Sequence, residues 1–463
     1  MLWKFIKEKM LSNPKQLMCE ENSSFSYEEA VIYAEVLSEK IRSESRVCIL
    51  CSSEMFSALG VMACFAAEVT AIPLSMRYGK EHCCRIMEQI CPDALITDIR
   101  GSLEVVYLER SDKTVPDECA LMLFTSGSTG KPKGVMLSEK NLLCNALDIC
   151  EYFKIDSSDK LLISRPIYHG AVLTGELLVS LIKGAKICFC SGKFDPQRML
   201  RLIEKEKITA LCATPTVFSV ISRMAGKYDV SSVKTIVVSG EKLSSAVAES
   251  IAKAFGGAAK YHVYGLTEAS PRVSYLPPEL FSEKHGSVGF PLRSVSVKIV
   301  SDNGQPAIPG ETGVLWVRGD NVMLGYFDDP EQSARVLRDG WLCTGDAAYI
   351  DKDGMLYIKG RSDDMIIRAG MNIYPAEIED VIEEDRRVKE VVAFPLYFDD
   401  GTCEIGMKIA GDFSDVSEVR ELCINTLPLY AVPVQIELVD ALEKTATGKK
   451  TKHKQKGIQN ENI

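Results

Sequence analysis

The sequence predicts an α/β protein: a large N-terminal domain of doubly wound sheets with a β-rich subdomain, followed by a small mobile α+β domain. Two observations support this prediction. In the first half of the chain, short apolar β-rich runs alternate with amphipathic helical stretches, which is typical of parallel sheets covered by helices. From about residue 294 the strands become closely spaced and are separated by turn signals, which is typical of antiparallel hairpins.

Each predicted strand of the first half is a short apolar run next to a helical pattern. This alternation gives the large domain its doubly wound character. The predicted strands are Val47–Cys51, Ala71–Leu74, Ala94–Thr97, Lys160–Ser164, Lys186–Cys190, Ala210–Ala213 and Thr235–Ser239, with helices beginning at Glu54 and Lys80.

The second half contains the β-rich subdomain, at about residues 294–359, and the small domain. The segment Asp302-Asn-Gly304 has the composition of a hairpin turn. We place the domain boundary at Ser362–Asp364, so the large domain covers residues 1–361 and the small domain residues 362–463. The predicted elements here are strands Val295–Val300, Gly313–Arg318, Met355–Lys359 and Val391–Phe394 and a helix beginning at Pro375.

The composition excludes several classes of protein. Of the 463 residues, 46% are hydrophobic, and 54 basic against 64 acidic side chains give a net charge of −10. This charge argues against a nucleic-acid or anionic membrane partner. The longest apolar run, Met55 to Ala67, is shorter than the roughly 20 residues of a membrane span and predicts a buried helix. The N-terminus has no signal-peptide pattern, so we expect a cytoplasmic protein.

The sixteen cysteines are scattered through apolar stretches and do not form a dense disulfide framework. Cys48 and Cys51 have C-x2-C spacing, but they lie in a predicted buried strand, and the sequence has no second CxxC or CxxH pair that would complete a metal site. We therefore interpret the cysteines as small hydrophobic residues in a reducing compartment.

The strongest motif is Leu121–Gly134, where an apolar strand leads into a loop of hydroxyls, glycines and lysines. Such a loop suits phosphate binding, because glycines let backbone N–H groups approach the oxygens and lysines offset their charge. Pro132 follows Lys131 and the glycine spacing differs from GxxxxGK[ST], so the loop is not that of an ordinary P-loop NTPase.

This loop and four further segments resemble motifs of the adenylate-forming enzymes, which include acyl-CoA synthetases, aryl acid ligases, peptide-synthetase adenylation domains and luciferases. The resemblance covers nearly the whole chain and is greatest to acyl- or aryl-acid:CoA ligases. It implies ATP, Mg²⁺ and a thiol acceptor as cofactors and substrates. The four further segments are Tyr264–Glu268, Trp341–Asp346, Gly360–Glu377 and Leu442–Lys449.

The resemblance implies a nucleotide site. In its second motif Tyr264 stacks on adenine beside Gly265, Thr267 contacts phosphate and Glu268 holds Mg²⁺. In the third and fourth motifs, Asp346 binds both ribose hydroxyls and Arg361 contacts the nucleotide; a simple turn aspartate remains the alternative for Asp346. The loop residues implied in phosphate binding or catalysis are Thr125, Ser126, Gly127, Ser128, Thr129, Gly130, Lys131 and Lys133.

The resemblance also implies moving parts. Lys449 reaches the active site during adenylation, where a cation stabilises the charge that gathers on the phosphoryl oxygens; a solvated basic tail is the alternative. Asp363 is the hinge, and Gly370 lets a phosphopantetheine arm pass the backbone. The chain has Glu443 where the family usually has proline, which affects the stiffness of the C-terminal loop.

The acid-binding region is expected at two segments. His169 and Gly170 resemble the gate of acyl- and aryl-CoA ligases, although a histidine at this place is also compatible with a core position. The run of Ser239, Gly240 and Glu241 is expected to form another wall. No aspartate occurs between Ser164 and Leu173, which disfavours an α-amino acid because its ammonium group would be buried without a partner.

These observations predict that the chain activates a carboxylic acid as acyl-AMP, releases pyrophosphate and transfers the acyl group to CoA. The alternative acceptor is the phosphopantetheine arm of a carrier protein. A non-catalytic nucleotide-binding relative is a second alternative, against which the combined presence of the lysines, Glu268, Asp346 and Arg361 argues. The sequence leaves the identity of the acid open.

Overall fold

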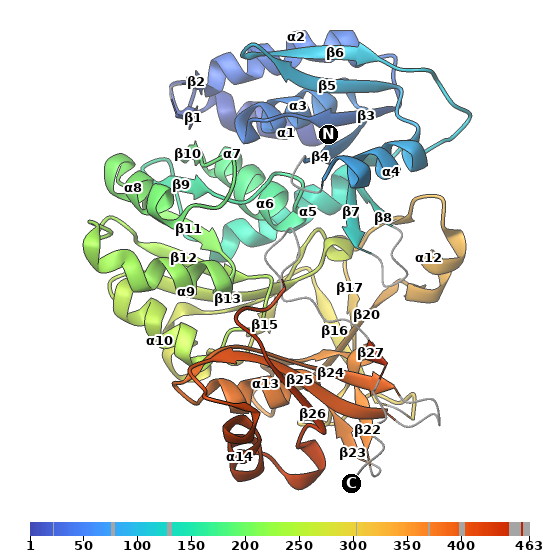
Figure 1. Ribbon diagram of the computed structural model, residues 1–463. Helices are drawn as coiled ribbons and strands as arrows, with labels where there is room; N and C mark the ends of the chain where they lie inside the picture. The colour runs from blue at the N-terminus through green and yellow to red at the C-terminus, as the bar shows by residue number, and fades with distance from the viewer. Residues whose placement is uncertain are drawn as a thin grey trace.

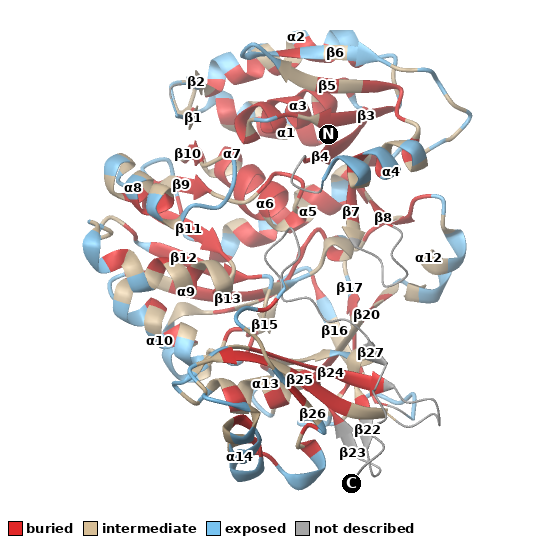
Figure 2. Cartoon of the chain, viewed as in Figure 1, coloured by how far each residue is buried: buried red, intermediate tan, exposed pale blue. Residues whose placement is uncertain are grey.

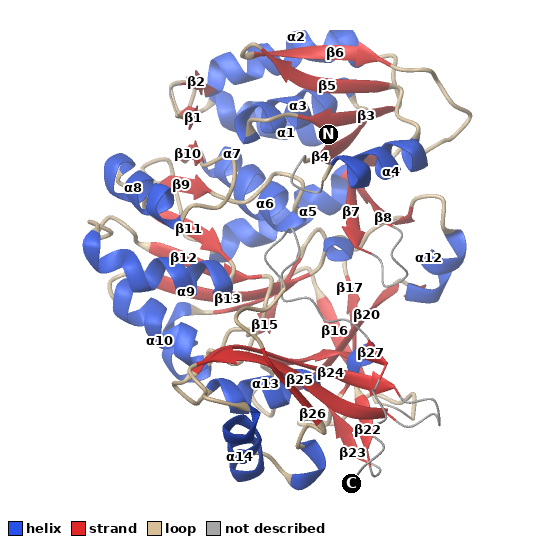
Figure 3. Cartoon of the chain, viewed as in Figure 1, coloured by secondary structure: helices blue, strands red, loops and turns tan. Residues whose placement is uncertain are grey.

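The computed structural model of the chain describes residues 1–21, 23–75, 79–126, 132–301, 303–368, 371–397, 403–443 and 455–456. Over these residues the predicted α/β class is confirmed. Sheets and helices follow one another from the N-terminal part, blue in Figure 1, to the C-terminal part, red at the lower end of the same view. Figure 3 shows helices lying along the large sheets and strands predominating below them.

The first sheet is parallel at its centre and covered on both faces. Val47 and Ile49 pack into the same cluster as α3, while Cys48 and Ile72 on the opposite face pack against α4. Within the described residues its strand order is β18 (Gly325–Tyr326), β8 (Pro132–Ser138), β7 (Cys119–Ser126), β4 (Thr70–Leu74), β3 (Arg46–Leu50), β5 (Ala94–Ile99) and β6 (Ser102–Tyr107). The helices next to it are α1 (Leu2–Leu11), α2 (Tyr27–Ile41), α3 (Glu54–Ala67) and α4 (Lys80–Ile90).

The second sheet carries the candidate site. In the described part of the chain its order is β15 (Phe290–Pro291), β14 (Arg272–Leu276), β13 (Ala259–Gly265), β12 (Thr235–Ser239), β11 (Ala210–Ala213), β9 (Lys160–Ile163), β10 (Lys186–Phe189), β1 (Leu17–Glu20) and β2 (Ser23–Ser26). The strands from β13 to β1 are parallel. Figure 2 shows buried residues along these strands.

Helices cover both faces of the second sheet. On one face, α8, α9 and α10 form a cluster with Leu162, Leu211 and Ile236. On the other face, the neighbouring strand residues Leu161 and Val237 join the central core shared with the first sheet. The covering helices are α5 (Glu139–Tyr152), α6 (Gly170–Val172), the π-helix η2 (Leu173–Leu178), α7 (Val179–Lys183), α8 (Pro196–Glu206), α9 (Pro215–Met224), η3 (Ala225–Lys227) and α10 (Ser245–Ala254).

The remaining strands form an antiparallel sheet and the C-terminal unit. The antiparallel strands are β16 (Ser296–Val300), β17 (Gly313–Arg318), β19 (Leu337–Arg338), β20 (Trp341–Ile350) and β21 (Leu356–Arg361), with α12 (Pro330–Val336) beside them. The C-terminal unit contains β22 (Ile366–Arg368), β23 (Met371–Ile373), α13 (Pro375–Glu383), β24 (Val388–Tyr397), β25 (Cys403–Gly411), α14 (Val416–Thr426), η7 (Leu429–Ala431), β26 (Gln435–Leu438) and β27 (Gln455–Lys456). Between β13 and β15 lie η4 (Thr267–Ala269), η5 (Pro278–Leu280) and α11 (Phe281–Lys284).

Most predicted elements occur within one or two residues of their expected bounds. The run from Met55 to Ala67 is the buried helix that its composition predicts, and no helix in the described ranges has the length and apolarity to span a bilayer. The extra strands β1, β2 and β18 and the π-helix were not predicted. The boundary at Ser362–Asp364 remains a prediction, because β21 runs directly into the short helix η6 (Ser362–Asp364).

Candidate active site

Several strands of the second sheet end at one common edge. Because β9, β12 and β13 are parallel, their carboxyl ends point the same way, and Arg165, Ser239 and Tyr264 lie at or just after these ends. The strand β14 is antiparallel to β13, and its first residue, Arg272, pairs with Gly265. Ligands of open α/β sheets bind outside the carboxyl ends of the strands, so this edge is the candidate active site.

The predicted nucleotide residues Tyr264, Asp346 and Arg361 meet beside this edge. The Tyr264 hydroxyl donates to Oδ2 of Asp346, and Arg361 Nη1 donates to Asp346 Oδ1 at 3.1 Å and to the Thr344 carbonyl at 2.8 Å. Asp346 and Arg361 face each other in the register of β20 and β21. Burial and the neighbouring Asp346 carboxylate raise the pKa of Tyr264 well above its ordinary value, so the phenol is a hydrogen-bond donor at neutral pH.

A second group of side chains surrounds Glu268, which lies in η4 together with Thr267. The Tyr326 hydroxyl donates to Glu268 Oε1 at 2.9 Å, and Lys133 Nζ lies 5.3 Å from the centre of the Tyr326 ring. Lys133 in turn pairs with Thr125 across β7 and β8. The sequence analysis missed Tyr326, because its two-residue strand belongs to none of the recognised motifs.

The Glu268 carboxylate fits the prediction of a magnesium ligand. Mg²⁺ is usually held by one or two carboxylates together with substrate phosphate oxygens and water. The described ranges contain no cluster of three or more His, Cys, Asp or Glu side chains that could hold a metal ion.

Gly265 is sterically constrained where β13 meets β14. A Cβ atom at this position would lie 2.2 Å from the Pro271 carbonyl oxygen, so only glycine fits.

Several predicted residues lie outside the described residues or are described by backbone alone. Ser126 is the last residue of β7, and Asp363 lies in η6; both are placed by their backbone only. The predicted residues outside the described ranges are Gly127, Ser128, Thr129, Gly130, Lys131, Gly370 and Lys449.

The predicted acid-side residues His169 and Gly170 lie at the start of α6. The His169 ring lies 4.2 Å from that of Tyr168, centre to centre. Gly170 is buried, and a Cβ atom there would lie 3.2 Å from Leu123 Cδ1 at the end of the first sheet. The segment therefore joins the two sheets beside the candidate site.

The three residues of the predicted wall, Ser239, Gly240 and Glu241, differ in their contacts. Ser239 is at the sheet edge and accepts a hydrogen bond from Arg165 Nη1 at 3.3 Å. Gly240 has a φ of +93°, a conformation that favours glycine and turns the chain away from β12. Glu241 Oε2 accepts a hydrogen bond from the Thr216 hydroxyl at 2.7 Å, so this carboxylate is engaged with the first turn of α9.

The structure adds a buried charged cluster that the sequence analysis missed. Glu176, on the π-helix η2, is fully buried and accepts a hydrogen bond of 2.5 Å from Arg165 Nη2. Burial raises the pKa of Glu176, while the guanidinium groups of Arg165 and Arg272 act in the opposite direction. An arginine directly after a buried strand and a glutamate inside an apolar helical run were the available signals.

The C-terminal unit contacts the large domain through α13. Lys242, which directly follows the predicted acid wall, forms an ion pair with Asp380. Lys359 Nζ forms a second ion pair with Glu377 Oε1 at 2.7 Å. These two contacts fix the present orientation of α13 beside the site.

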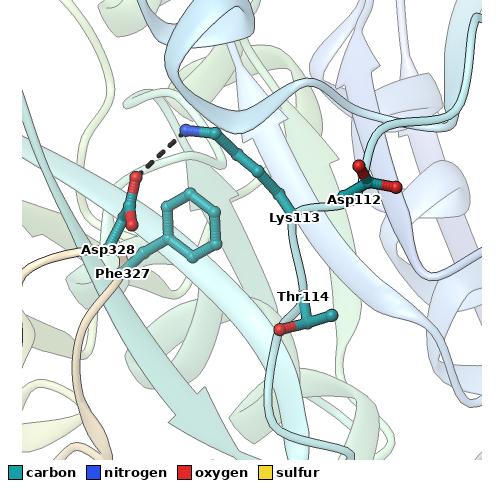
Figure 4. A pocket seen from close by; sticks show the side chains of 5 residues that line it. All are labelled: Asp112, Lys113, Thr114, Phe327 and Asp328. Carbon is teal, nitrogen blue, oxygen red and sulfur yellow. Dashed lines mark hydrogen bonds and ion pairs between the residues drawn. The ribbon is translucent and has the colours of Figure 1, made fainter.

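A separate cavity of about 410 Å³ lies between the segment before β7 and the segment after β18 (Figure 4). Lys113 Nζ forms an ion pair of 3.1 Å with Asp328 Oδ2 across it, and Phe327, Asp112 and Thr114 complete its lining. None of the predicted site residues is among these five, so we do not include this cavity in the active site.

Comparison with known proteins identifies the family of the chain. The profile of AMP-binding enzymes matches residues 20–327. The chain belongs to the AMP-binding enzyme family. A feruloyl-CoA synthase of an Amycolatopsis species is 35% identical over 358 residues, which cover 75% of this chain and 72% of that protein. An indoleacetate–CoA ligase of Aromatoleum aromaticum is 32% identical over 354 residues, covering 74% of this chain and 69% of the ligase.

Solved structures of this AMP-binding fold superpose on the whole chain. The o-succinylbenzoate CoA synthetase of Bacillus subtilis, in complex with its acyl-adenylate intermediate, has a TM-score of 0.84 at 25% identity and 96% coverage of both chains. The same synthetase has also been solved with ATP and magnesium ion, with a TM-score of 0.83. A double mutant of it bound to a CoA product analogue has the same coverage but a TM-score of 0.69.

Proposed function

We propose that this AMP-binding enzyme is an AMP-forming acid–thiol ligase, which makes acyl-AMP from ATP and a carboxylic acid and transfers the acyl group to CoA. The observation that carries the proposal is the meeting of Tyr264, Asp346 and Arg361 at the edge where β12 and β13 end. Feruloyl-CoA synthase and indoleacetate–CoA ligase, by their names, make thioesters of this kind.

In the proposed ATP complex, the adenosine part binds at Tyr264 and Asp346. The two Asp346 oxygens already accept hydrogen bonds from Tyr264 and Arg361, which holds the carboxylate in place for ribose hydroxyls. The phosphates extend toward the loop that follows Thr125. Lys133 and Glu268 both contact Tyr326 there, Lys133 at the face of the ring and Glu268 at the hydroxyl. Mg²⁺ bound at Glu268 would neutralise part of the phosphate charge.

In the first half-reaction, a carboxylate oxygen of the acid attacks the α-phosphorus. A new O–P bond forms, the bond between the α-phosphorus and the bridging oxygen breaks, and pyrophosphate leaves. Negative charge grows on the leaving pyrophosphate, so cations are most useful there. Lys133 from β8 and Lys449 from the C-terminal loop are the side chains that we assign to this task.

In the second half-reaction, the thiol gives up its proton to solvent and its sulfur attacks the acyl carbonyl. A C–S bond forms, and AMP leaves with the electrons of the C–O bond. We propose that the small domain turns about Asp363, withdraws Lys449 and brings Gly370 to the site. The TM-scores support this motion, since the chain resembles the adenylate-bound synthetase (0.84) more than the form with a CoA product analogue (0.69).

CoA is our proposed acceptor, because feruloyl-CoA synthase, indoleacetate–CoA ligase and a long-chain-fatty-acid–CoA ligase, each more than 30% identical to the chain, are named for CoA thioesters. The phosphopantetheine arm of a carrier protein has the same thiol and is the alternative. We also propose a reducing cytoplasmic setting, which is supported by sixteen free cysteines.

A pyrophosphate-release assay on a panel of carboxylic acids, with and without CoA, tests the proposed function. We expect release that depends on the acid and on ATP, and acyl-CoA that mass spectrometry detects when CoA is present. Release without acyl-CoA, followed by loading of a purified carrier protein, would show that CoA is the wrong acceptor. An Asp346→Ala variant that keeps full activity would contradict the nucleotide site.

A further inference from the structure

The guanidinium group of Arg272 is buried without a partner. Arg272 is 3% exposed, yet within the part of the chain that the structure describes its side chain has no hydrogen bond and no ion pair, and its Nε atom is buried without an acceptor. Its backbone, in contrast, is fixed by the side chain of Asn145, at 3.0 Å for the N–H and 2.8 Å for the carbonyl. A charge held in such a place is costly unless a counter-ion reaches it.

Arg272 lies on the acid side of the active site. It pairs with Gly265 at the common edge of the sheet, one residue beyond the Tyr264 that contacts Asp346. A Cβ atom on Gly175 would lie 3.0 Å from Arg272 Nη2, so the guanidinium lies against the π-helix η2 that follows His169 and Gly170. This π-helix also carries Glu176, the partner of Arg165.

The charges in this region do not balance. Arg165 and Arg272 supply two positive charges, and Glu176 supplies one negative charge, whose Oε1 is engaged with Arg165. The other titratable groups that face the cluster do not supply an anion: burial raises the pKa of Tyr152 to about 12 and that of the Cys212 thiol well above its usual value. One positive charge is therefore left over.

Further polar atoms in the cluster also lack partners. The Thr174 hydroxyl, one residue before Gly175, is buried and makes no hydrogen bond among the described residues. The Nε atoms of Arg165 and Arg272 are likewise buried without an acceptor, and Glu176 Oε2 is buried without a donor, again within the described ranges. Unpaired donors gathered around a surplus positive charge are the arrangement that binds a carboxylate, which accepts a fork of parallel hydrogen bonds from guanidinium.

We propose that the acid substrate of this ligase is a dicarboxylic acid, one carboxylate of which reacts with ATP while Arg272 binds the other. This inference rests on the proposed function and names its substrate class. The names of related proteins leave the class open, because ferulate, indoleacetate and long-chain fatty acids carry one carboxylate and 2-succinylbenzoate carries two. The carboxylate would replace the counter-ion that Arg272 lacks.

The first experiment compares matched acids. Pyrophosphate release is measured with the linear dicarboxylates from malonate to suberate, with phthalate and terephthalate, and with the monocarboxylates of equal carbon number. We expect kcat/KM for the best dicarboxylate to exceed that of its matched monocarboxylate about 100-fold, because the monocarboxylate leaves a buried guanidinium unpaired. Equal rates for the two acids of each pair would overturn the inference and leave the proposed function standing.

The second experiment tests Arg272 itself. Arg272→Met should remove the preference, lowering kcat/KM for the dicarboxylate about 100-fold while monocarboxylates are used at least as well as before. Arg272→Lys keeps the positive charge but cannot donate two parallel hydrogen bonds to a carboxylate. It should therefore retain part of the preference for dicarboxylates. A loss of equal size for both acids would show that Arg272 has no selective role and would overturn the inference.

A binding measurement separates this inference from the proposed function. The best dicarboxylate should raise the melting temperature of the wild-type protein, in the presence of ATP and Mg²⁺, and fail to do so for Arg272→Met. If this shift occurs but no acid releases pyrophosphate, the dicarboxylate site stands and the proposed reaction is wrong. If neither shift nor release occurs with any acid, both are wrong.

The variant itself is expected to fold. Because the wild-type guanidinium has no partner in the free protein, Arg272→Met should melt at the same or a higher temperature than the wild type. A clear drop in melting temperature would show that Arg272 stabilises the free protein, and would contradict the unpaired state on which the inference depends.

Discussion

The two ends of the active site differ in how their charges are balanced. At the nucleotide end, Asp346 accepts hydrogen bonds from Tyr264 and Arg361, and Glu268 accepts one from Tyr326. At the acid end, Arg272 has no side-chain hydrogen bond or ion pair to any described residue. We therefore propose that the nucleotide end is held in place before ATP binds, whereas the acid end is completed by its ligand.

This difference indicates where the specificity of the enzyme lies. A network whose members satisfy one another is preorganised for a ligand that every member of the family shares. An uncompensated charge, in contrast, favours only ligands that supply the opposite charge. Substitutions that disturb one end at a time can therefore test whether the two ends differ in this way.

The largest effect is expected from Glu176→Gln at the acid end. This substitution leaves the guanidinium group of Arg165 without its counter-ion, which should lower the free energy of unfolding by about 3–5 kcal/mol in urea denaturation at pH 7. Adding Arg272→Met to this variant should recover part of the loss. A loss below about 1 kcal/mol would show that Glu176 is already protonated in the folded protein.

A loss of rate is expected from Lys449→Ala. Removal of a cation that stabilises the departing pyrophosphate should slow acid-dependent pyrophosphate release roughly 100- to 1000-fold. The variant should still convert chemically prepared acyl-AMP and CoA to the thioester, which liquid chromatography can follow. Lys450→Ala, a neighbouring lysine of the same basic tail, is the matched control and should retain the rate of the wild type.

A pH effect is expected at the nucleotide end, through the strand that carries Tyr264. Burial lowers the pKa of His262 from an ordinary value of 6.5 to about 4, and its Nδ1 lies 2.9 Å from the carbonyl oxygens of His285 and Ser287. The unfolded chain takes up a proton first as the pH falls. The stability contributed by neutral His262 is therefore complete above pH 6.5 and is lost between pH 6.5 and 4.

The size of this loss is about 3 kcal/mol, since each unit of pKa difference corresponds to about 1.4 kcal/mol. Thermal unfolding from pH 7 to pH 4 should show it, and His262→Gln should flatten the dependence over this interval. Partly exposed His285, whose carbonyl is one of the acceptors, is the control: His285→Gln should keep the slope. Identical slopes for wild type and His262→Gln would contradict the assignment.

The smallest effect is expected at the surface contact between the two domains. The Lys242–Asp380 pair is partly exposed and should contribute at most about 1 kcal/mol to the present orientation of α13. Lys242→Ala should therefore change the ratio of the two half-reaction rates only a few-fold. Added salt, which screens the ion pair, should change this ratio of the wild type in the same direction. Lys234→Ala, on the same domain, should leave the ratio unchanged; a large change in both variants would point to a general charge effect.

Much of the fold could be predicted from local patterns. The strands at Ala210–Ala213, Thr235–Ser239 and Gly313–Arg318 have the predicted bounds, because each is an apolar run ended by a turn or cap signal. The strand β18 could not be predicted, since two residues carry no periodicity and pair only because β8 lies beside them.

The residues of the candidate site also divide into those that the sequence predicts and those that only the structure reveals. Tyr264, Glu268, Asp346 and Arg361 stand in continuous motifs, so the sequence alone pointed to them. Tyr326 lies outside every motif, and its hydroxyl reaches Glu268 only in the folded chain. Glu241 could be placed near the acid by sequence, but only the structure shows that its carboxylate contacts Thr216.

The family, the α/β class and a set of candidate residues for the nucleotide end can be read from the sequence alone, because these depend on motifs in which neighbouring residues act together. Only the tertiary structure decided the charge of the acid end. Arg165, Glu176 and Arg272 come from three separate segments of the chain, and none of these segments by itself shows that the three charges meet. Glu176 and Arg272 are buried and Arg165 is only partly exposed, so the gathering of two positive charges and one negative charge at one edge is a property of packing.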